Sequence, residues 1–258
     1  KRDLEIFPVS GNKSLYDLFN LCHTQGGKAV LSRMMSEPSS DIQFLEQRKN
    51  TIIFIQSNLE FVNKLDIDKN SLDFIEHYLY HFNYPTRKPT KYRVVEKALA
   101  YRIKPDNDYY IIERGVDYMV EVLNNLHSFF SELREIPHTT SLNEIIDRVL
   151  FVLSGEEYVK ILDVENLSKL KAIDIADFDY MFRYTHKDQM KYFLDLIYRI
   201  DALMGVAKSV EKYNLSYPEL LPFSDHKIEI EGLFHPFIDK PVCNNILLDK
   251  SKNMAFVS

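Results

Sequence analysis

Residues 112–133, IERGVDYMVEVLNNLHSFFSEL, carry apolar side chains at spacings that alternate between four and three. This alternation is typical of a coiled-coil seam, an apolar stripe along one face of a helix. It predicts one long helix over about residues 108–135. The first seam consists of Ile112, Val116, Met119, Leu123, Leu126, Phe130 and Leu133.

A second seam with the same alternation lies on a helix predicted over about residues 186–213. Two long helices that each carry a seam most simply pack on each other as an antiparallel arm. We therefore expect a mainly α fold with a helical core and long antiparallel lever helices. The second seam consists of Met190, Phe193, Ile197, Ile200, Met204 and Ala207.

Shorter helices are predicted around these two. Only 7 glycines and 10 prolines interrupt the 258 residues, which favours helices over a fold with many turns. Ser39, Ser40 and Asp41 are candidate N-caps for a helix that continues to about Leu65. The other predicted helices cover residues 14–22, 28–36, 141–153 and 156–162, and one from Asn70 or Ser71 to about His81.

The character of the sequence changes after Tyr217-Pro218. Residues 227–231 alternate between polar and apolar as a strand does, and 245–248 and 254–257 read as two more strands. We expect a helical domain over residues 1–220. Residues 221–258 are expected to be the beginning of a second domain that is cut short.

Composition excludes several classes of protein. Hydrophobic residues make up 45% of the chain, enough for a core, so a disordered chain is excluded. No apolar run approaches the roughly 18 residues that span a bilayer. Cys22 and Cys243 have no partner spacing, which indicates a reducing, cytoplasmic protein without a disulfide framework. The net charge of -6 argues against these residues forming the main nucleic-acid binding surface of a protein.

Two groups of titratable residues are candidates for chemistry. His77 and His81 lie four apart, as metal ligands on a helix do, but no third ligand is placed with them. Two half-buried ring edges are the favoured interpretation, so we predict no metal. Asp174, Asp177 and Asp179 are interpreted as turn and helix-cap residues. No phosphate-binding loop or nucleophile elbow is present, and no catalytic residue is assigned.

Residues 87–104 are rich in basic side chains, with two tyrosines among them. Such a mixture can bind nucleic acid, but most charged runs are solvated helix faces, and the sequence leaves both alternatives open. The candidate nucleic-acid patch consists of Arg87, Lys88, Lys91, Arg93 and Lys97.

The stretch TQGGKAVLSRMMSEPSSD, residues 24–41, resembles the start of the core domain of the MutS family of DNA mismatch repair ATPases. A threonine, a glycine three residues on, a helix with apolar and arginine residues, and a proline and an aspartate three apart carry this likeness. The matching residues are Thr24, Gly27, Leu31, Arg33, Pro38 and Asp41, and then Leu45 and Arg48.

The later stretch DALMGVAKSVEKYNLSYPEL, residues 201–220, resembles the returning lever helix of the same family. His235-Pro236 and VCNNILL, residues 242–248, resemble elements near its nucleotide. The likeness implies a core and lever domain (domain III) that ends just before the phosphate-binding loop. It places Val242, Asn244, Asn245 and Ile246 near the adenine edge.

The resemblance also implies a function. In the full-length protein the lever would couple the state of ATP to engagement of mismatched or branched DNA. ATP, magnesium and a homodimer are expected there, whereas these 258 residues are expected to lack cofactor and enzymatic activity. The family's DNA clamp has little room between residues 133 and 186. The alternative is a helical protein-interaction module without a DNA role.

Overall fold

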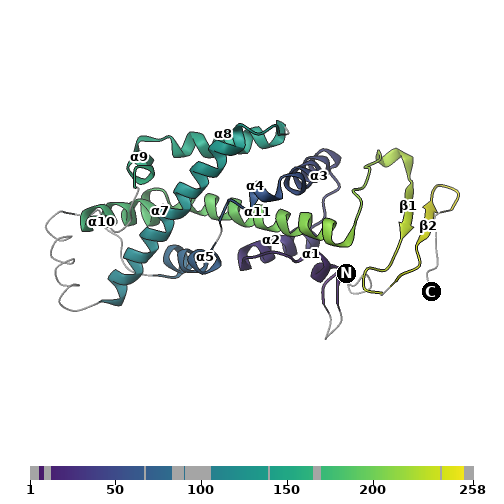
Figure 1. The fold of residues 1–258 in the computed structure, drawn as a ribbon, viewed down its shortest axis with the longest axis horizontal. Helices are drawn as coiled ribbons and strands as arrows, with labels where there is room; N and C mark the ends of the chain where they lie inside the picture. The colour runs from purple at the N-terminus through teal and green to yellow at the C-terminus, as the bar shows by residue number, and fades with distance from the viewer. Residues whose placement is uncertain are drawn as a thin grey trace.

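The computed structural model describes residues 6–8, 13–66, 68–82, 90, 106–138, 140–164, 170–238 and 240–252. Within these ranges the protein is mainly α, as predicted, and a two-stranded hairpin follows the helices (Figure 1). The first helices are α1 (Leu15–Phe19), α2 (Gln25–Ser36), α3 (Ile42–Ser57), α4 (Leu59–Val62) and α5 (Lys69–Glu76). The later ones are α7 (Asn107–Arg134), α8 (Thr140–Leu153), α9 (Glu156–Leu162), α10 (Ala172–Tyr180) and α11 (Lys187–Tyr213).

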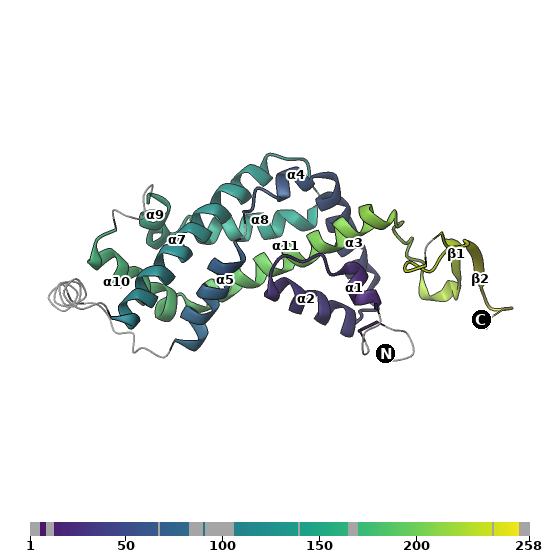
Figure 2. The ribbon, with the colours of Figure 1, turned by 60° about the horizontal axis from the view of Figure 1, so that its bottom comes forward.

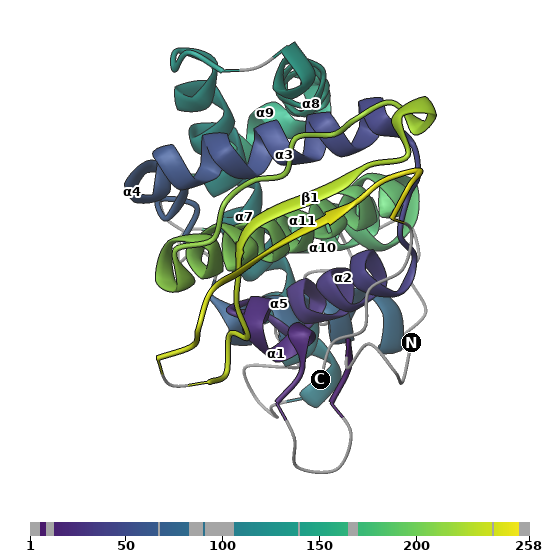
Figure 3. The same cartoon turned by 90° about the vertical axis from the view of Figure 1, so that its right-hand side faces the viewer.

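The two long predicted helices are present, with bounds close to those expected, but they have different main neighbours. Helix α11 packs chiefly against α2 and α3, which lie on opposite sides of it (Figure 3). Helix α7 packs chiefly against α8, α9, α10 and α5. In Figure 1, α7 runs obliquely across the line of α11 rather than along it, and in Figure 2 the two helices diverge from each other. The sequence predicted that the two long helices pack on each other along their length as an antiparallel arm. Instead, each seam is covered mainly by shorter helices.

Capping side chains set where several helices begin. Thr24 accepts a hydrogen bond from the backbone N–H of Gly27 at the start of α2, and Asp41 accepts one from Phe44 at the start of α3. Helix α5 is capped by Asp68, not by Asn70 or Ser71 as predicted. The helix expected to reach Leu65 breaks at Asn58 into α3 and α4.

Two π-helical turns were not predicted. The turn η1 (His77–His81) continues α5, and η3 (Met181–Thr185) joins α10 to α11. A π turn holds one more residue than an α turn and occurs mostly as a single turn inside an α-helix. Sequence periodicity gives no separate signal for it, so residues 70–81 were expected to be an uninterrupted helix.

The hairpin lies at one end of the molecule, beyond the C-terminal end of α11 (Figure 1). A short 3₁₀ turn, η4 (Phe223–Asp225), leads to β1 (Ile228–Leu233), which pairs antiparallel with β2 (Asn244–Leu248). The register shifts between Ile230 and Leu233, which marks a bulge. The strand predicted over residues 254–257 lies outside the described residues.

Apolar side chains of the helices form a continuous core. It includes Val30 and Leu31 of α2, Ile52 and Ile55 of α3, and most of both seams. No helix in the described ranges combines the length and the apolar character needed to cross a bilayer. The helical part thus buries its apolar faces against one another.

Candidate functional site

Both predicted seams are buried over most of their length. Every member of the first seam is fully buried except Ile112, and every member of the second except Ile200; these two are half-buried. The two helices approach each other where they cross, since Leu126 and Ile197 line the same small cleft. The seams therefore anchor two different layers of helices and meet at one crossing.

Asp201 on α11 joins that helix to the start of α2. Its carboxylate accepts hydrogen bonds from the backbone N–H groups of His23 and Thr24, both at 2.8 Å, and from the Thr24 hydroxyl at 2.7 Å. The carboxylate is buried, so these charge-assisted bonds hold the N-terminus of α2 firmly on α11. A negative charge also suits the positive end of the helix dipole.

Gly27 allows this close approach. A Cβ atom at position 27 would lie 2.1 Å from Oδ2 of Asp201, which no neighbouring group could relieve without moving the carboxylate. The Thr24 hydroxyl in turn accepts the N–H of Gly27 at 2.9 Å. Thr24, Gly27 and Asp201 thus form one joint, which we call the α2–α11 joint.

A second contact lies one turn further along α11. A Cβ atom at Gly205 would lie 3.1 Å from the backbone nitrogen and the sulfur of Cys22. The Ser209 hydroxyl donates to the carbonyl of Leu18 at 2.9 Å. Burial, together with the negative charge of Asp201, raises the pKa of the Cys22 thiol to about 12. This cysteine is therefore an inert part of the packing.

The segment after α11 is fastened to α3. Asn214 ends the helix in the left-handed conformation, with φ of 49°. The Tyr217 hydroxyl donates to Oε1 of Gln56 at 2.7 Å, and Nζ of Lys49 donates to the carbonyl of Pro218 at 3.2 Å. The path from α11 toward the hairpin thus begins as part of the helical body.

The four predicted nucleotide-edge residues lie on or just before β2. Val242 is 80% exposed. Asn244 donates to the Val242 carbonyl at 3.4 Å, and Oδ1 of Asn245 accepts the Gly232 N–H at 2.8 Å. Ile246 pairs with Ile230 across the hairpin. Asn245 therefore stabilises the bulged strand by a hydrogen bond, whereas the side chain of Val242 is exposed to solvent.

The hairpin presents one apolar face. Ile228 pairs with Leu248, and Ile230 with Ile246, so these four side chains lie on the same face. The opposite face carries Glu229 with Leu247. The side chains of Ile228 and Ile230 are exposed.

The remaining candidates fall in three places. The patch of Arg87, Lys88, Lys91, Arg93 and Lys97 lies outside the described residues. His77 and His81 lie on η1 with ring centroids 6.4 Å apart, and both are exposed, so their interpretation as half-buried ring edges is wrong. No cluster of metal-ligating side chains occurs in the described part of the chain.

The three aspartates of residues 174–179 do not share one role. Asp174 accepts the backbone N–H of Lys171 at 3.1 Å and so caps α10, as predicted. The interpretation of Asp179 as a turn or cap residue is wrong, because its side chain is buried and paired with Arg183. The spacing of four between these two residues was the available signal, since it is the spacing of ion pairs on a helix.

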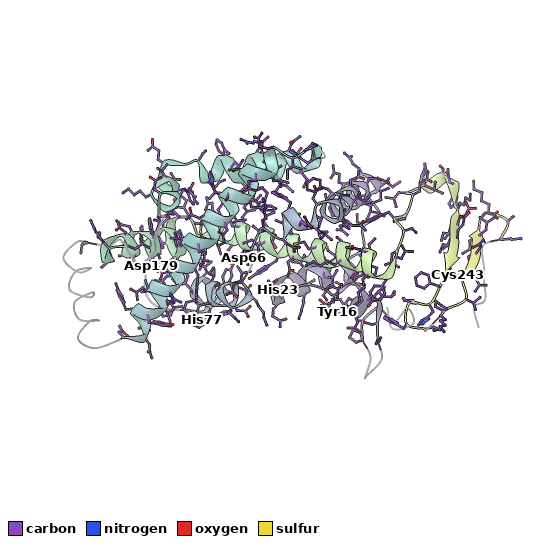
Figure 4. The ribbon with its side chains drawn as sticks, in the orientation of Figure 1. Tyr16, His23, Asp66, His77, Asp179 and Cys243 are labelled. Carbon is purple, nitrogen blue, oxygen red and sulfur yellow. The ribbon has the colours of Figure 1, made fainter. Side chains whose placement is uncertain are left out.

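A small cleft lies near the crossing of α7 and α11. Asp66, labelled in Figure 4, is one of the residues that line it. Hydrogen bonds from the hydroxyl and then the backbone N–H of Ser71 lower the pKa of Asp68 in this cleft. That carboxylate is therefore occupied as a helix cap. The cleft is lined by Leu65, Asp66, Asp68, Ser71, Leu72, Glu121, Val122, Asn125, Leu126 and Ile197.

Comparison with known proteins adds no relative. No protein-family model matches the chain, and a search of curated proteins finds no similar sequence. The function is therefore argued from the residues and their contacts.

Proposed function

We propose that this chain is the core and lever part of a MutS-like DNA mismatch repair ATPase, which couples the state of bound ATP to engagement of DNA. One observation carries the proposal. The two stretches of sequence that resemble this family, residues 24–41 and 201–220, meet at the α2–α11 joint through Thr24, Gly27 and Asp201. Thr24 and Gly27 of the first matching stretch and Asp201 of the second are thus the residues that form the joint.

The mechanical role is supported by the way α11 is held. It is tied to α2 by Asp201 and to the loop before α2 at Gly205, it packs against α3, and the segment that follows it is tied to α3 through Tyr217. A helix fixed at several points along its length moves as one body with its neighbours. A displacement at the hairpin end would therefore reach the crossing with α7, where Ile197 and Leu126 lie together.

The remaining parts of the proposal concern the full-length protein. ATP and magnesium would bind in the ATPase domain, with Val242, Asn244, Asn245 and Ile246 at the adenine edge. DNA with a mismatch or branch would be the partner, in a cytoplasmic homodimer, and Arg87, Lys88, Lys91, Arg93 and Lys97 would contact its phosphates. These 258 residues alone would not hydrolyse ATP.

The first test is to read the codons that follow Ser258 in the gene. A glycine-rich stretch that ends in Gly-Lys-Ser or Gly-Lys-Thr is expected, because this motif cradles the phosphates of ATP. A stop codon or an unrelated sequence there would contradict the ATPase assignment.

A second test measures binding of the full-length protein to branched and linear duplexes over a range of salt concentrations. Replacing Arg87, Lys91 and Arg93 by glutamine should weaken binding and reduce the salt slope by about one for each lost phosphate contact. The matched control replaces three exposed lysines near the hairpin, Lys240, Lys250 and Lys252, and should leave the slope unchanged. Equal effects of the two sets would contradict a DNA-contacting patch.

A protein-interaction module without a DNA role is the second candidate. Phe151 at the end of α8 is 80% exposed, and Val159 on α9 is exposed as well. Exposed apolar side chains are often used in protein contacts. Stable assembly that Phe151→Ser abolishes, without salt-dependent DNA binding, would favour this function over the lever.

A further inference from the structure

Two π turns that lie about a hundred residues apart in the sequence share one buried polar cluster. Asp179 of α10 is its centre (Figure 4). Its carboxylate accepts hydrogen bonds from Nε of Arg183 at 2.6 Å, from a terminal nitrogen of Arg183 at 2.8 Å, and from the Tyr78 hydroxyl at 2.7 Å. Arg183 belongs to η3 and Tyr78 to η1, so the cluster bridges the two π turns.

Aromatic rings and a glycine enclose the cluster. The guanidinium carbon of Arg183 lies 5.3 Å from the ring centroid of Tyr78 and 5.1 Å from that of Phe82. A Cβ atom at Gly115 of α7 would lie only 2.4 Å from the Tyr78 ring. Tyr78 therefore contacts both the ion pair and the backbone of α7.

The position of the Asp179–Arg183 pair relative to η3 gives the cluster a role in setting helix register. The pair spans the boundary between α10 and the π turn, and its two parallel hydrogen bonds demand one relative orientation of the side chains. A π turn holds one residue more than an α turn, so loss of the π turn at η3 would change the register of the residues around Arg183. Such a change would separate the two buried charges, which is costly because each would lose the hydrogen bonds of the pair while still buried.

We propose that the Tyr78–Asp179–Arg183 cluster couples the two π turns into one cooperative unit, a switch point at which η1 and η3 open and close together. Opening would release α10 and α5 from α7 while α2, α3 and the C-terminal half of α11 remain folded, because the latter are held by the separate α2–α11 joint. This coupling does not depend on the proposed ATPase function.

Amide hydrogen exchange of the whole chain, read by mass spectrometry, tests the coupling. Tyr78→Phe removes the hydroxyl, including its hydrogen bond to Asp179, and keeps the ring, so the variant should fold. Exchange should become about tenfold faster in peptides that cover residues 77–82 and, equally, in those that cover 181–186. Exchange in α2 and in residues 201–213 should change by less than about twofold.

Tyr158→Phe is the matched control. Tyr158 lies on α9, is as buried as Tyr78, and its hydroxyl has no hydrogen-bond partner among the described residues. This variant should leave exchange in both π turns unchanged. Arg183→Lys, which keeps the charge but loses the planar fork, should reproduce the coupled opening.

Three results would overturn the proposal. One is faster exchange in residues 77–82 alone, which would show that the π turns open independently. Another is faster exchange in α2 and residues 201–213 to the same extent, which would make the cluster part of the global core. The third is no change in either π turn.

Discussion

The carboxylate of Asp201 accepts a hydrogen bond from the hydroxyl of Thr24 at 2.7 Å, across 177 positions of sequence. The same carboxylate accepts the backbone N–H of Thr24 and of His23, so one α11 side chain satisfies donors in front of α2. The backbone N–H groups at the start of a helix otherwise find hydrogen-bond partners in nearby capping side chains or in water. The start of α2 therefore depends on a residue far away in the chain.

Asp201→Asn should lower the free energy of unfolding by about 2–3 kcal/mol, because an amide presents only one acceptor where the buried carboxylate receives three bonds. Urea unfolding followed by circular dichroism measures this. Thr24→Ser keeps the hydroxyl and should cost less than about 1 kcal/mol. If Asp201→Asn lowered the free energy of unfolding no more than Thr24→Ser does, the charge of Asp201 would contribute nothing to stability.

Gly27→Ala should destabilise the protein by about 2 kcal/mol, because the new methyl group would overlap the Asp201 carboxylate. Gly155→Ala is the control, since its Cβ atom would meet only the flexible end of Glu157, at 3.2 Å. The two thermal melting curves should differ clearly. If Gly27→Ala had the same melting temperature as the native protein, α2 and α11 could not approach as closely as the structure places them.

Val116→Asp and Phe193→Asp should each lower the free energy of unfolding by at least about 3 kcal/mol, because each puts an unpaired charge at a fully buried seam position. Ile112→Asp lies in the first seam but at a half-buried position, and it should cost less than half as much. The check is the denaturation midpoint of the three variants. Unchanged midpoints for Val116→Asp would place that seam at the surface.

Hydrophobic spacing predicted the long helices well. The expected ranges of 108–135 and 186–213 differ by one residue at most from the ends of α7 and α11, and two predicted strands are present. Spacing reports which face of a helix is apolar but not which neighbour covers it. For that reason the sequence indicated two seams correctly and paired them with each other, whereas α2, α3 and α8 to α10 cover much of their length.

The joints were harder to predict than the helices. Thr24 and Gly27 were identified from a motif, but the role of Asp201 as their shared partner depends on the crossing of α2 and α11, which no local pattern encodes. The same holds for Tyr78, whose hydroxyl meets Asp179 across about a hundred residues. Local sequence also cannot separate a π turn from an α turn, because the extra residue is accommodated by tertiary contacts.

The stability of the protein should fall above pH about 9, in part because of Cys22. In the folded state burial raises the thiol pKa from 9.0 to about 12, so the thiol stays neutral. In the unfolded chain the thiol ionises near pH about 9, which stabilises that state. The contribution is thus complete below the unfolded pKa and is lost as the pH rises from about 9 toward about 12.

Cys22→Ala should flatten the decline of the urea midpoint between pH about 8 and pH about 10.5, because the alanine variant has no thiol to ionise there. Cys243→Ala is the matched control, since that cysteine is exposed and should leave the decline unchanged. In the native protein a thiol reagent should react quickly with Cys243 and slowly with Cys22. Rapid reaction at Cys22, or an equally steep decline in Cys22→Ala, would contradict a thiol that is buried against Gly205 of α11.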